Sequence, residues 1–366
     1  MQPNPEPNPN PNPKPKKISE GAYGCIYKPS ITQRSKIETR YVNKIQVQKP
    51  RTQEEPRLGK IIKTIPNYLR YFAPSEQVSN LVVSVIEKRE IKKCKSLDKK
   101  KDTETIVALK IPYVGEKTLG EQIQLYHEKL PNTTLSHLLG FHQHLANALR
   151  KLEDEKIRIV HHDLKENNIM YSTKLNCPII IDFGLAFQVD KMETPEEIEK
   201  VFFTHYEKYA PWSIEIVCIG TIIHTNEWHR KHIHLPSILN ETIETVFREN
   251  PIYQLCREYV GNERMKQEEN RWKKYIKNIS KSNSNSNSNS HTIQGEKAVL
   301  ALQEYWDTWD MYSVNVMMLK QLDKYYPLSQ EEDTRITNYR DKLINQILHV
   351  PSMRGNLAVP PNPLPS

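Results

Sequence analysis

The fold of this chain is constrained most by one run of eight residues, His161-His162-Asp163-Leu164-Lys165-Glu166-Asn167-Asn168. Fourteen residues after Asn168 comes Asp182-Phe183-Gly184, which directly follows the apolar run Ile179–Ile181, a predicted buried β-strand. Glycine is scarce, at 11 of 366 residues, so each glycine is more informative than usual. Acidic, basic and amide groups at this spacing, with a strand between them, are not expected from a chance cluster in a loop.

The two segments resemble the H-R-D-L-K-x-x-N catalytic loop and the D-F-G motif of the eukaryotic protein kinase family. In that family, phosphoryl transfer depends on a positioned hydroxyl and on neutralised phosphate charge. The resemblance implies that Asp163 is the catalytic base and that Lys165 holds the γ-phosphate as charge develops. It also implies that Asn168 and Asp182 are oxygen ligands for Mg²⁺, so ATP and Mg²⁺ are the expected cofactors.

Upstream, Ile18–Lys28 is similar to the kinase glycine-rich loop, G-x-G-x-x-G-x-V. Ser19 stands in place of the first glycine, and Ile26 stands in place of the valine. Glycine matters in this loop because backbone N–H groups must approach the phosphates closely. The residues that the resemblance implies for ATP binding here are Ile18, Ser19, Gly21, Ala22, Tyr23, Gly24 and Ile26.

The run Val42-Asn43-Lys44-Ile45 resembles the V-A-I-K strand, which implies that Lys44 reaches the α- and β-phosphates. Its expected carboxylate partner is Glu55, because Glu55-Pro56-Arg57-Leu58 fits the E-x-x-L pattern, and Glu54 is the second candidate. Proline is tolerated only in the first turn of a helix, so the helix is expected to begin close to Glu55.

A further ATP contact is expected where the strand-like run Thr105–Ile111 passes into Pro112-Tyr113-Val114-Gly115. This stretch looks like the hinge between kinase lobes, whose backbone recognises the edge of adenine, with Ile111 as the gatekeeper. Proline has no N–H, so the resemblance implies that adenine bonds to the Pro112 carbonyl and the Val114 N–H.

Two departures from the family pattern concern activation. His162 replaces an arginine that pairs with a phosphorylated activation-loop residue, and histidine makes such a pair weaker and pH-dependent. We therefore predict activity without obligatory phosphorylation of Thr194 or Thr204. The run Tyr209-Ala210-Pro211-Trp212 keeps the Ala-Pro of the A-P-E motif but lacks its glutamate. Arg354, which resembles the arginine that pairs with that glutamate, needs another acidic partner, and Glu215 is the candidate.

Two segments resemble the D-x-W-S-x-G helix of the larger kinase lobe: Ser213–Gly220 and Asp310–Val314. The second fits better, because it has the Asp, an aromatic residue and the Ser in order and opens an apolar helical run. This choice makes residues 213–300 an insertion that contains the Ser/Asn-rich stretch 281–291, an expected disordered loop. Its histidines lack paired cysteines or an H-E-x-x-H pattern and are expected to be structural: His224, His229, His232 and His234.

Two kinds of secondary structure are expected in succession along the chain. Short β-like runs come early, at Cys25–Tyr27, Tyr41–Val47 and Leu81–Ile86, whereas helical periodicity dominates after residue 118 and is clearest in Leu135–Leu152. The basic run Lys92–Lys101 is expected to be a solvated hairpin loop. The whole predicts an α+β, bilobal kinase-like fold with a small β-rich N-lobe, 18–115, and a larger helical C-lobe, 116–356. Residues 1–17, rich in Pro and Asn, and 357–366 are expected to be tails.

Composition bounds the partners and the location. The net charge of +8 suits a nucleotide or another polyanion, but no aromatic-interleaved basic motif is present, so we expect no specific nucleic-acid binding. Five cysteines, widely spaced and without a C-x-x-C pair, predict no disulfide framework and a reducing intracellular compartment. No signal sequence is expected at the N-terminus, and the longest apolar stretch, Ile214–Ile223, is too short to span a membrane.

The resulting hypothesis is an ATP- and Mg²⁺-dependent serine/threonine protein kinase that acts on protein hydroxyls, since Lys165 in D-L-K-x-x-N is typical of the serine/threonine members. A catalytically silent kinase-fold scaffold and a small-molecule phosphotransferase similar to aminoglycoside and choline kinases stay open as alternatives. The atypical segments look like the serine/threonine kinases of large nucleocytoplasmic DNA viruses, which implies the host cytoplasm or the virion. The sequence indicates no oligomeric state.

Overall fold

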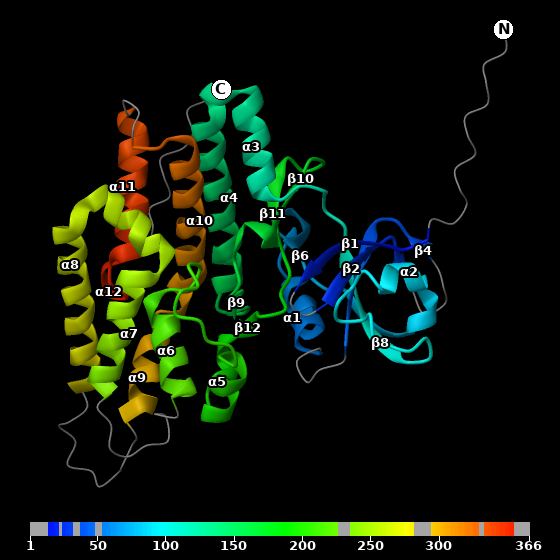
Figure 1. Cartoon of the computed structure of the whole chain (residues 1–366), viewed down its shortest axis with the longest axis horizontal. Coiled ribbons are helices and arrows are strands. Elements are labelled where there is room, and N and C mark those ends of the chain that lie inside the picture. Colours follow the sequence, from blue (N-terminus) through cyan, green and yellow to red (C-terminus); the bar gives the residue numbers. More distant parts are fainter. Residues whose placement is uncertain are drawn as a thin grey trace. The chain divides into compact units, whose positions relative to one another are not determined.

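The computed structural model of this chain describes residues 14–21, 24–31, 37–47, 53–225, 235–281, 294–328 and 333–354 (Figure 1). The chain forms two compact units. The first comprises Met1–Gly115 and Ile179–Gly184, and the second comprises Glu116–Pro178 and Leu185–Ser366.

A five-stranded antiparallel sheet in the order β1-β2-β5-β8-β7 is the framework of the first unit. Its strands are β1 (Lys16–Gly21), β2 (Gly24–Lys28), β5 (Tyr41–Gln46), β7 (Gln77–Val82) and β8 (Thr105–Pro112). Alternate side chains of these strands, among them Tyr27, Ile45 and Ala108, point into one buried apolar cluster. Strand β1 begins at Lys16, two residues before the expected start of the domain.

Shorter elements complete the first unit. They are β3 (Ser30–Ile31), β4 (Ile37–Glu38), α1 (Glu54–Ile62), the 3₁₀ turns η2 (Tyr68–Arg70) and η3 (Val83–Val85), β6 (Phe72–Ala73) and α2 (Lys88–Ile91). Residues Ile180–Ile181 of β11 (Cys177–Ile181) pair in parallel with β6. The predicted strand Leu81–Ile86 was wrong in its second half, since β7 ends at Val82. A straight strand would point Leu81 and Ile86 to opposite faces, and the 3₁₀ turn brings both into the same core.

The basic run Lys92–Lys101 is not a simple solvated loop, because Cys94 and Leu97 within it are fully buried in the core of the first unit. Cys94 forms a disulfide with Cys25 of β2, so the expectation of no disulfide was wrong for this pair. The two cysteines are 69 residues apart in the sequence, so no local motif predicts that they pair. The segment after α2 lies against the β1–β2 hairpin, where the Lys95 N–H donates to Glu20 at 2.9 Å. The other three cysteines, Cys177, Cys218 and Cys256, are buried thiols that form no disulfide.

The second unit is mainly helical, as predicted. Its helices are α3 (Leu119–Lys129), α4 (Thr134–Glu153), α5 (Pro195–Val201), α6 (Ile214–His224), α7 (Leu235–Glu249), α8 (Pro251–Lys281), α9 (Gln294–Gln303), α10 (Trp309–Tyr325), α11 (Thr334–Leu348) and α12 (Pro351–Arg354). Its short elements are β9 (Ile159–Val160), β10 (Ile169–Ser172), β12 (Phe187–Gln188) and the 3₁₀ turns η4 (Pro131–Thr133), η5 (Glu166–Asn168), η6 (Val189–Lys191) and η7 (Trp306–Thr308).

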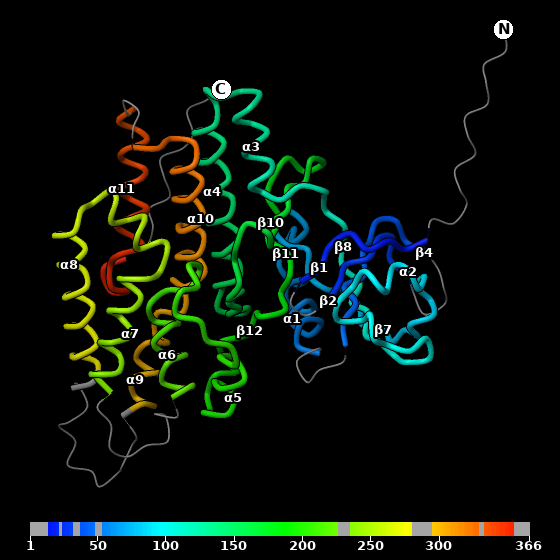
Figure 2. The backbone as a smooth tube through the Cα atoms, viewed as in Figure 1, coloured from blue at the N-terminus to red at the C-terminus, as the bar shows by residue number. Residues whose placement is uncertain are grey.

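Helix α10 lies at the centre of this unit and packs on α4 and α11 (Figure 2). Helix α4 contains the predicted amphipathic stretch Leu135–Leu152 and buries one face of it, including Leu138 and Leu145. Helix α3 begins with a capping box, in which Thr118 and Glu121 exchange side chain-to-backbone bonds. Helix α8 is bent at Gly261, which has a φ of 77°. Glycine adopts this backbone angle without steric cost because it has no Cβ.

The expected insertion, residues 213–300, contributes to the core of the second unit. Trp272 of α8 is fully buried and its indole N–H donates to the Leu348 carbonyl at 2.8 Å. Tyr253, also on α8, is fully buried. Most of the Ser/Asn-rich stretch, together with His229, His232 and His234, lies outside the described residues, as does the C-terminal tail. His224 closes α6, with Nε2 lying 2.9 Å from the Phe202 carbonyl.

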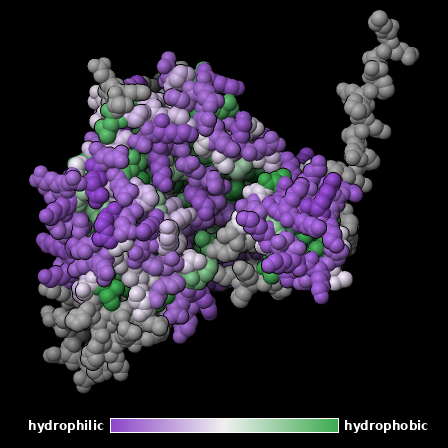
Figure 3. All heavy atoms as spheres, in the orientation of Figure 1, coloured by the Kyte–Doolittle hydropathy of each residue, from purple (hydrophilic) through white to green (hydrophobic). Residues whose placement is uncertain are grey.

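The exposed side chains are mostly hydrophilic on the face of the molecule drawn in Figure 3, and the apolar ones are scattered. Single exposed apolar residues, such as Phe203 and Leu300, are ordinary at a protein surface. Among the described helices, none combines the length and the apolar character that crossing a membrane requires.

Candidate active site

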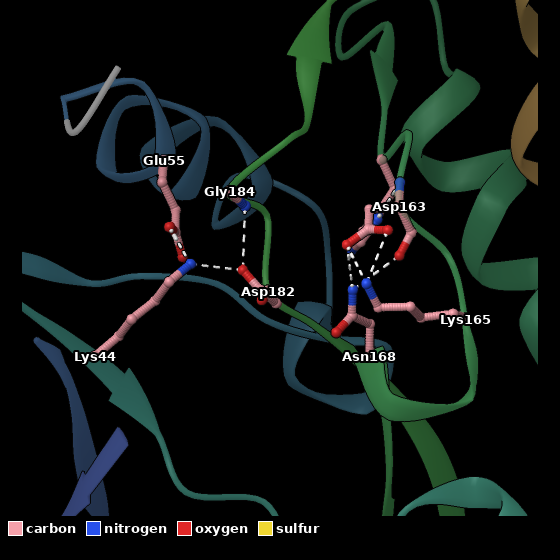
Figure 4. Close-up of polar contacts among 8 residues, drawn as sticks. Lys44, Glu55, Asp163, Lys165, Asn168, Asp182 and Gly184 are labelled. Carbon is pink, nitrogen blue, oxygen red and sulfur yellow. Dashed lines mark hydrogen bonds and ion pairs between the residues drawn. The ribbon is translucent and has the colours of Figure 1, made fainter. Parts of the chain in front are cut away.

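Lys44 of β5 is the centre of a buried ionic cluster in the first unit. Its Nζ lies 2.8 Å from Glu55 Oε2 and 2.6 Å from Asp182 Oδ1 (Figure 4). Burial by itself lowers the pKa of Lys44, but the charges of Glu55 and Asp182 outweigh it and raise that pKa above its usual range. A cation is therefore fixed at this point of the sheet.

The helix partner of Lys44 is Glu55, the first of the two candidates. Helix α1 begins at Glu54, so Pro56 falls in its first turn, where a missing N–H costs no helical bond. Glu55 is 4% exposed and points to Lys44, whereas Glu54 pairs with Arg57 at 2.9 Å. The one-residue difference matters because successive helical residues project about 100° apart.

Asp182, Phe183 and Gly184 form a bend held by their own side chains. Asp182 has a φ of 60°, and its Oδ1 accepts from the Gly184 N–H at 3.3 Å. A Cβ on Gly184 would lie 3.0 Å from Lys44 Nζ and 3.1 Å from Asp182 Oδ1, so a larger residue would crowd the ionic cluster. Phe183 is buried and meets the Phe72 ring edge-on at 6.2 Å. The apolar anchor fixes the bend and leaves the Asp182 carboxylate 40% exposed.

The glycine-rich segment forms the β1–β2 hairpin, in which Gly21 lies opposite Gly24. A Cβ on Gly24 would lie 2.2 Å from the carbonyl oxygen of Ile45 on the neighbouring strand, so glycine is required there for close strand packing. Ile18 and Ser19 are exposed on β1, and Ile26 is partly buried on β2. Ala22 and Tyr23 lie outside the described residues.

The predicted hinge residues follow β8. Pro112 is its last residue and pairs with Tyr41 of β5. The next N–H, that of Tyr113, donates to the Arg40 carbonyl at 2.9 Å, and Val114 lies in the irregular stretch that ends the first unit.

Asp163 is the centre of a second polar cluster, in the second unit (Figure 4). Lys165 Nζ lies 3.0 and 2.9 Å from its two carboxylate oxygens. The Asn168 amide nitrogen donates to the Asp163 carbonyl at 2.8 Å and to Oδ2 at 2.9 Å. The 3₁₀ turn η5 carries Asn168 back over the loop and makes this double contact possible.

The backbone of the loop that bears Asp163 is held in place by hydrogen bonds to Asp310 of α10. The Asp310 carboxylate accepts the His161 N–H at 2.6 Å and the His162 N–H at 3.0 Å. Asp310 is 6% exposed, and burial raises its pKa, an effect that His161 and the two backbone donors oppose. The Asp310–Val314 segment thus supports the catalytic-loop backbone. Within the described residues, the other candidate segment, Ser213–Gly220, makes no such carboxylate contact with that backbone.

A family comparison agrees with this geometry. Residues 14–211, more than half of the chain, match the family described as protein tyrosine and serine/threonine kinase. The chain belongs to the protein kinase family. No curated protein sequence matches the chain. Membership confirms the α+β kinase fold and indicates an ATP-binding phosphotransferase, without distinguishing serine and threonine from tyrosine as the acceptor.

In this kinase His162 is buried in an aromatic cluster and is not exposed at the surface, where a phosphorylated residue could pair with it. It is 3% exposed, stacks on Trp212 with ring centroids 5.2 Å apart, and meets Phe187 and Phe202 edge-on. The Trp212 indole N–H donates to the His162 carbonyl at 2.9 Å. Trp212, which replaces the glutamate of A-P-E, therefore joins the activation segment of the kinase directly to the catalytic loop.

The acidic partner predicted for Arg354 is confirmed. The Arg354 guanidinium makes two parallel bonds to Glu215 of α6, at 2.5 and 3.1 Å. The two side chains are 3% and 0% exposed. In the usual kinase pattern the carboxylate comes from A-P-E, and here it comes from the next helix along the chain.

Two contacts of the kinase site were missed from the sequence. Asp310 was singled out by its motif, but not as an acceptor for the catalytic-loop backbone. Tyr209 was noted only as part of an imperfect A-P-E motif, yet its hydroxyl donates to Asp163 Oδ1 at 2.5 Å. Its position directly before Ala-Pro was the one available signal.

Proposed function

We propose that this chain is an ATP- and Mg²⁺-dependent serine/threonine protein kinase that transfers the γ-phosphoryl group to protein hydroxyls. The observation that carries the proposal is the arrangement around Asp163. Lys165 and Asn168 hold the Asp163 carboxylate from two sides, and the catalytic-loop backbone rests on Asp310. Such fixation gives a base one orientation in which to accept the proton of an incoming hydroxyl.

The residues present fit ATP and Mg²⁺. The Asp182 carboxylate and the Asn168 amide oxygen are the hard oxygen donors that Mg²⁺ prefers, and the Asn168 nitrogen is already bonded to Asp163. Gly21 and Gly24 lie opposite each other in the glycine-rich hairpin and carry no side chain, so backbone N–H groups there can approach a phosphate. Mg²⁺, when bound, supplies charge neutralisation between the phosphates.

Each remaining residue has a role set by its charge. Lys44, kept cationic by Glu55 and Asp182, would bind the α- and β-phosphates. Lys165 is 41% exposed while it contacts Asp163, so its ammonium can also reach a γ-phosphate at the side of the base. We propose that Pro112 and Val114 hold adenine through their backbone, as in other hinges. Serine/threonine specificity rests on Lys165 in D-L-K-x-x-N.

One assay tests the proposal. The purified chain is given labelled ATP, with and without Mg²⁺, and mixed protein substrates, beside Asp163→Asn and Lys44→Met variants whose folding is checked by thermal unfolding. We expect Mg²⁺-dependent label on serine and threonine that both substitutions abolish. ATP binding without transfer would indicate a silent scaffold, and turnover of a metabolite alone would indicate a small-molecule phosphotransferase.

The comparisons lend no support to the resemblance to kinases of large DNA viruses. The Cys25–Cys94 disulfide argues against the expected reducing compartment, in which such bonds are rare.

Activity without phosphate on Thr194 or Thr204 remains our prediction. The buried position of His162 supports it, because a phosphate on either threonine would find no arginine to pair with at this position.

A further inference from the structure

A pocket of about 250 Å³ lies beside the catalytic loop, and all of its lining residues belong to the second unit. It is lined by residues 164–167 of the loop, by Pro211 of the activation segment and by one face of α10. Lys165 is shared between the pocket and the proposed base, because it lines the pocket while its Nζ contacts the Asp163 carboxylate (Figure 4). The pocket therefore begins directly beside Asp163.

The buried side chains that line the pocket are mostly apolar, whereas the exposed ones are polar. Leu164, Val316 and Met317 are 1%, 2% and 3% exposed and form an apolar floor. Lys320 is exposed and follows Val316 by one helical turn, so it lies on the same face of α10, at the rim of the pocket. Such a pocket suits a side chain with an aliphatic stem and a polar end.

Hydrogen bonds fix the walls of the pocket. The Ser313 hydroxyl of α10 donates to the Pro211 carbonyl at 2.6 Å, which joins this helix to the activation segment. The Gln321 amide nitrogen donates to Glu166 Oε1 at 2.8 Å, which joins the same helix to the catalytic loop. Because the three walls are already connected, a side chain that enters the pocket does not have to order them.

Glu166 is the one acidic residue among those that line the pocket in the described part of the chain, and its charge is already engaged. Its Oε1 accepts from Gln321. A Cβ on Gly120, in the first turn of α3, would lie 3.0 Å from Glu166 Oε2, so this oxygen lies against the N-terminus of that helix. The helix dipole offsets a negative charge there. Glu166 is therefore a poor partner for a cation in the pocket.

The two lysines of the pocket differ in what balances them. Lys165 is paired with Asp163 at 2.9 Å. Lys320 has no ion pair or hydrogen bond with any other residue that the structure describes. The charge left unbalanced in the pocket is thus the positive charge of Lys320, which favours an anion and disfavours a cation.

We propose, on the basis of the kinase function proposed above, that this pocket binds an acidic side chain of the acceptor protein, close in sequence to the hydroxyl that is phosphorylated. The stem of a glutamate would pack on Leu164 and Met317, and its carboxylate would pair with Lys320. In an extended segment each residue advances about 3.3 Å, and alternate side chains point to the same side. The acidic residue is therefore expected within three positions of the acceptor.

Serine peptides that differ at one position test the preference. The full chain is given ATP, Mg²⁺ and a peptide series with glutamate, alanine or lysine at each of the three positions on either side of the serine. We expect glutamate at one position to raise kcat/KM about fivefold over alanine, mainly through KM, because the pocket contains no reacting atom. Lysine at that position should give the lowest value. A preference for lysine, or none at any position, would overturn the proposal.

Substitutions of Lys320 assign the preference to the pocket. In each variant we compare kcat/KM for the glutamate peptide with that for the alanine peptide, so a general loss of activity cancels. Lys320→Arg should keep the ratio, Lys320→Ala should lower it to about one, and Lys320→Glu should favour the lysine peptide. Lys324→Ala, at an exposed lysine one turn further along α10 and outside the pocket, is the matched control and should keep the wild-type ratio. An unchanged ratio in Lys320→Glu would refute the assignment.

A binding assay separates failure of the pocket from failure of the proposed function. Fluorescent peptides with alanine in place of the acceptor serine report binding to the chain by anisotropy. Tighter binding of the glutamate peptide that is lost in Lys320→Glu, in a folded chain that transfers no phosphate, would overturn the function and support the pocket. Transfer to serine without any acidic preference would overturn the pocket and leave the function standing. Neither transfer nor an acidic preference in binding would overturn both.

Discussion

Arg354 and Glu215 form a fully buried, two-bond ion pair between α12 and α6, 139 residues apart in the chain. A buried charge that loses its partner keeps its full desolvation cost, so removing one member is far more damaging than removing both.

We expect Glu215→Gln to lower the free energy of unfolding by about 3 to 5 kcal/mol, measured by urea denaturation. Glu244→Gln is the matched control, because Glu244 pairs with Lys273 at 2.6 Å but is 48% exposed, and should change stability by less than about 1 kcal/mol. The double variant Glu215→Leu with Arg354→Met should recover much of the loss. Equal effects of the two single glutamate changes would contradict this account.

Asp310→Asn should impair catalysis through the backbone of the catalytic loop. Both carboxylate oxygens accept backbone N–H groups, and an amide offers one oxygen and points an NH₂ at the second donor. We expect kcat to fall by about 100-fold with little change in the KM for ATP. Asp307→Asn, at an exposed residue one turn earlier, serves as the control. An unchanged kcat in a folded Asp310→Asn protein would refute the positioning role.

Gly24→Ala should destabilise the first unit and weaken ATP binding. The added Cβ would meet the Ile45 carbonyl oxygen at 2.2 Å, so β2 and β5 must separate, at a cost of about 1 to 3 kcal/mol. At Gly21 the nearest atom to an added Cβ is 3.9 Å away, so Gly21→Ala should cost clearly less stability. Thermal unfolding and the KM for ATP measure the two effects, and similar melting temperatures for both variants would count against the steric argument.

His142 should make stability depend on pH below neutrality. Burial lowers the pKa of His142 to about 4, and its Nδ1 lies 2.9 Å from the Tyr339 hydroxyl. The unfolded chain binds a proton near its ordinary pKa of 6.5, so stability is fully present above pH 6.5 and falls by about 3 kcal/mol as pH drops toward 4. His142→Gln, which does not titrate, should flatten that slope in urea unfolding curves recorded across this pH range. An unaltered slope would assign the effect to other groups.

The disulfide should stabilise the first unit. We expect Cys94→Ser to cost about 2 to 4 kcal/mol, because the bond closes a loop of 69 residues in the unfolded chain. Dithiothreitol should lower the melting temperature of the wild type but not that of Cys94→Ser. Cys256→Ser, at a free and buried thiol, controls for the loss of a sulfur. No response of the wild type to the reductant would argue that the bond contributes nothing.

The residues that we propose to bind the phosphates could be picked out from the sequence because they occur in short runs whose spacing is local. Asp163, Lys165 and Asn168 lie within six positions, and their mutual contacts follow from one turn of backbone. The choice of Glu55 over Glu54 was also local, since it depended on where a helix with Pro56 can begin.

Contacts between segments that are distant in the sequence could not be predicted in this way. Cys25 and Cys94, 69 residues apart, carry no motif that marks them as partners, and only the packing of the hairpin on the segment after α2 brings their sulfurs together. The strand end at Val82 was missed for a related reason, because the side to which Ile86 turns depends on where the core lies.

The sequence by itself determined which groups this kinase has for chemistry, because charge and hydrogen-bonding capacity are properties of residue types. Tertiary structure alone decided what those groups face. It placed Tyr209 on Asp163, Asp310 beneath the catalytic loop and Glu215 against Arg354. Each of these contacts joins segments 46 to 149 residues apart, and their energies depend on burial and angle, which no local pattern encodes.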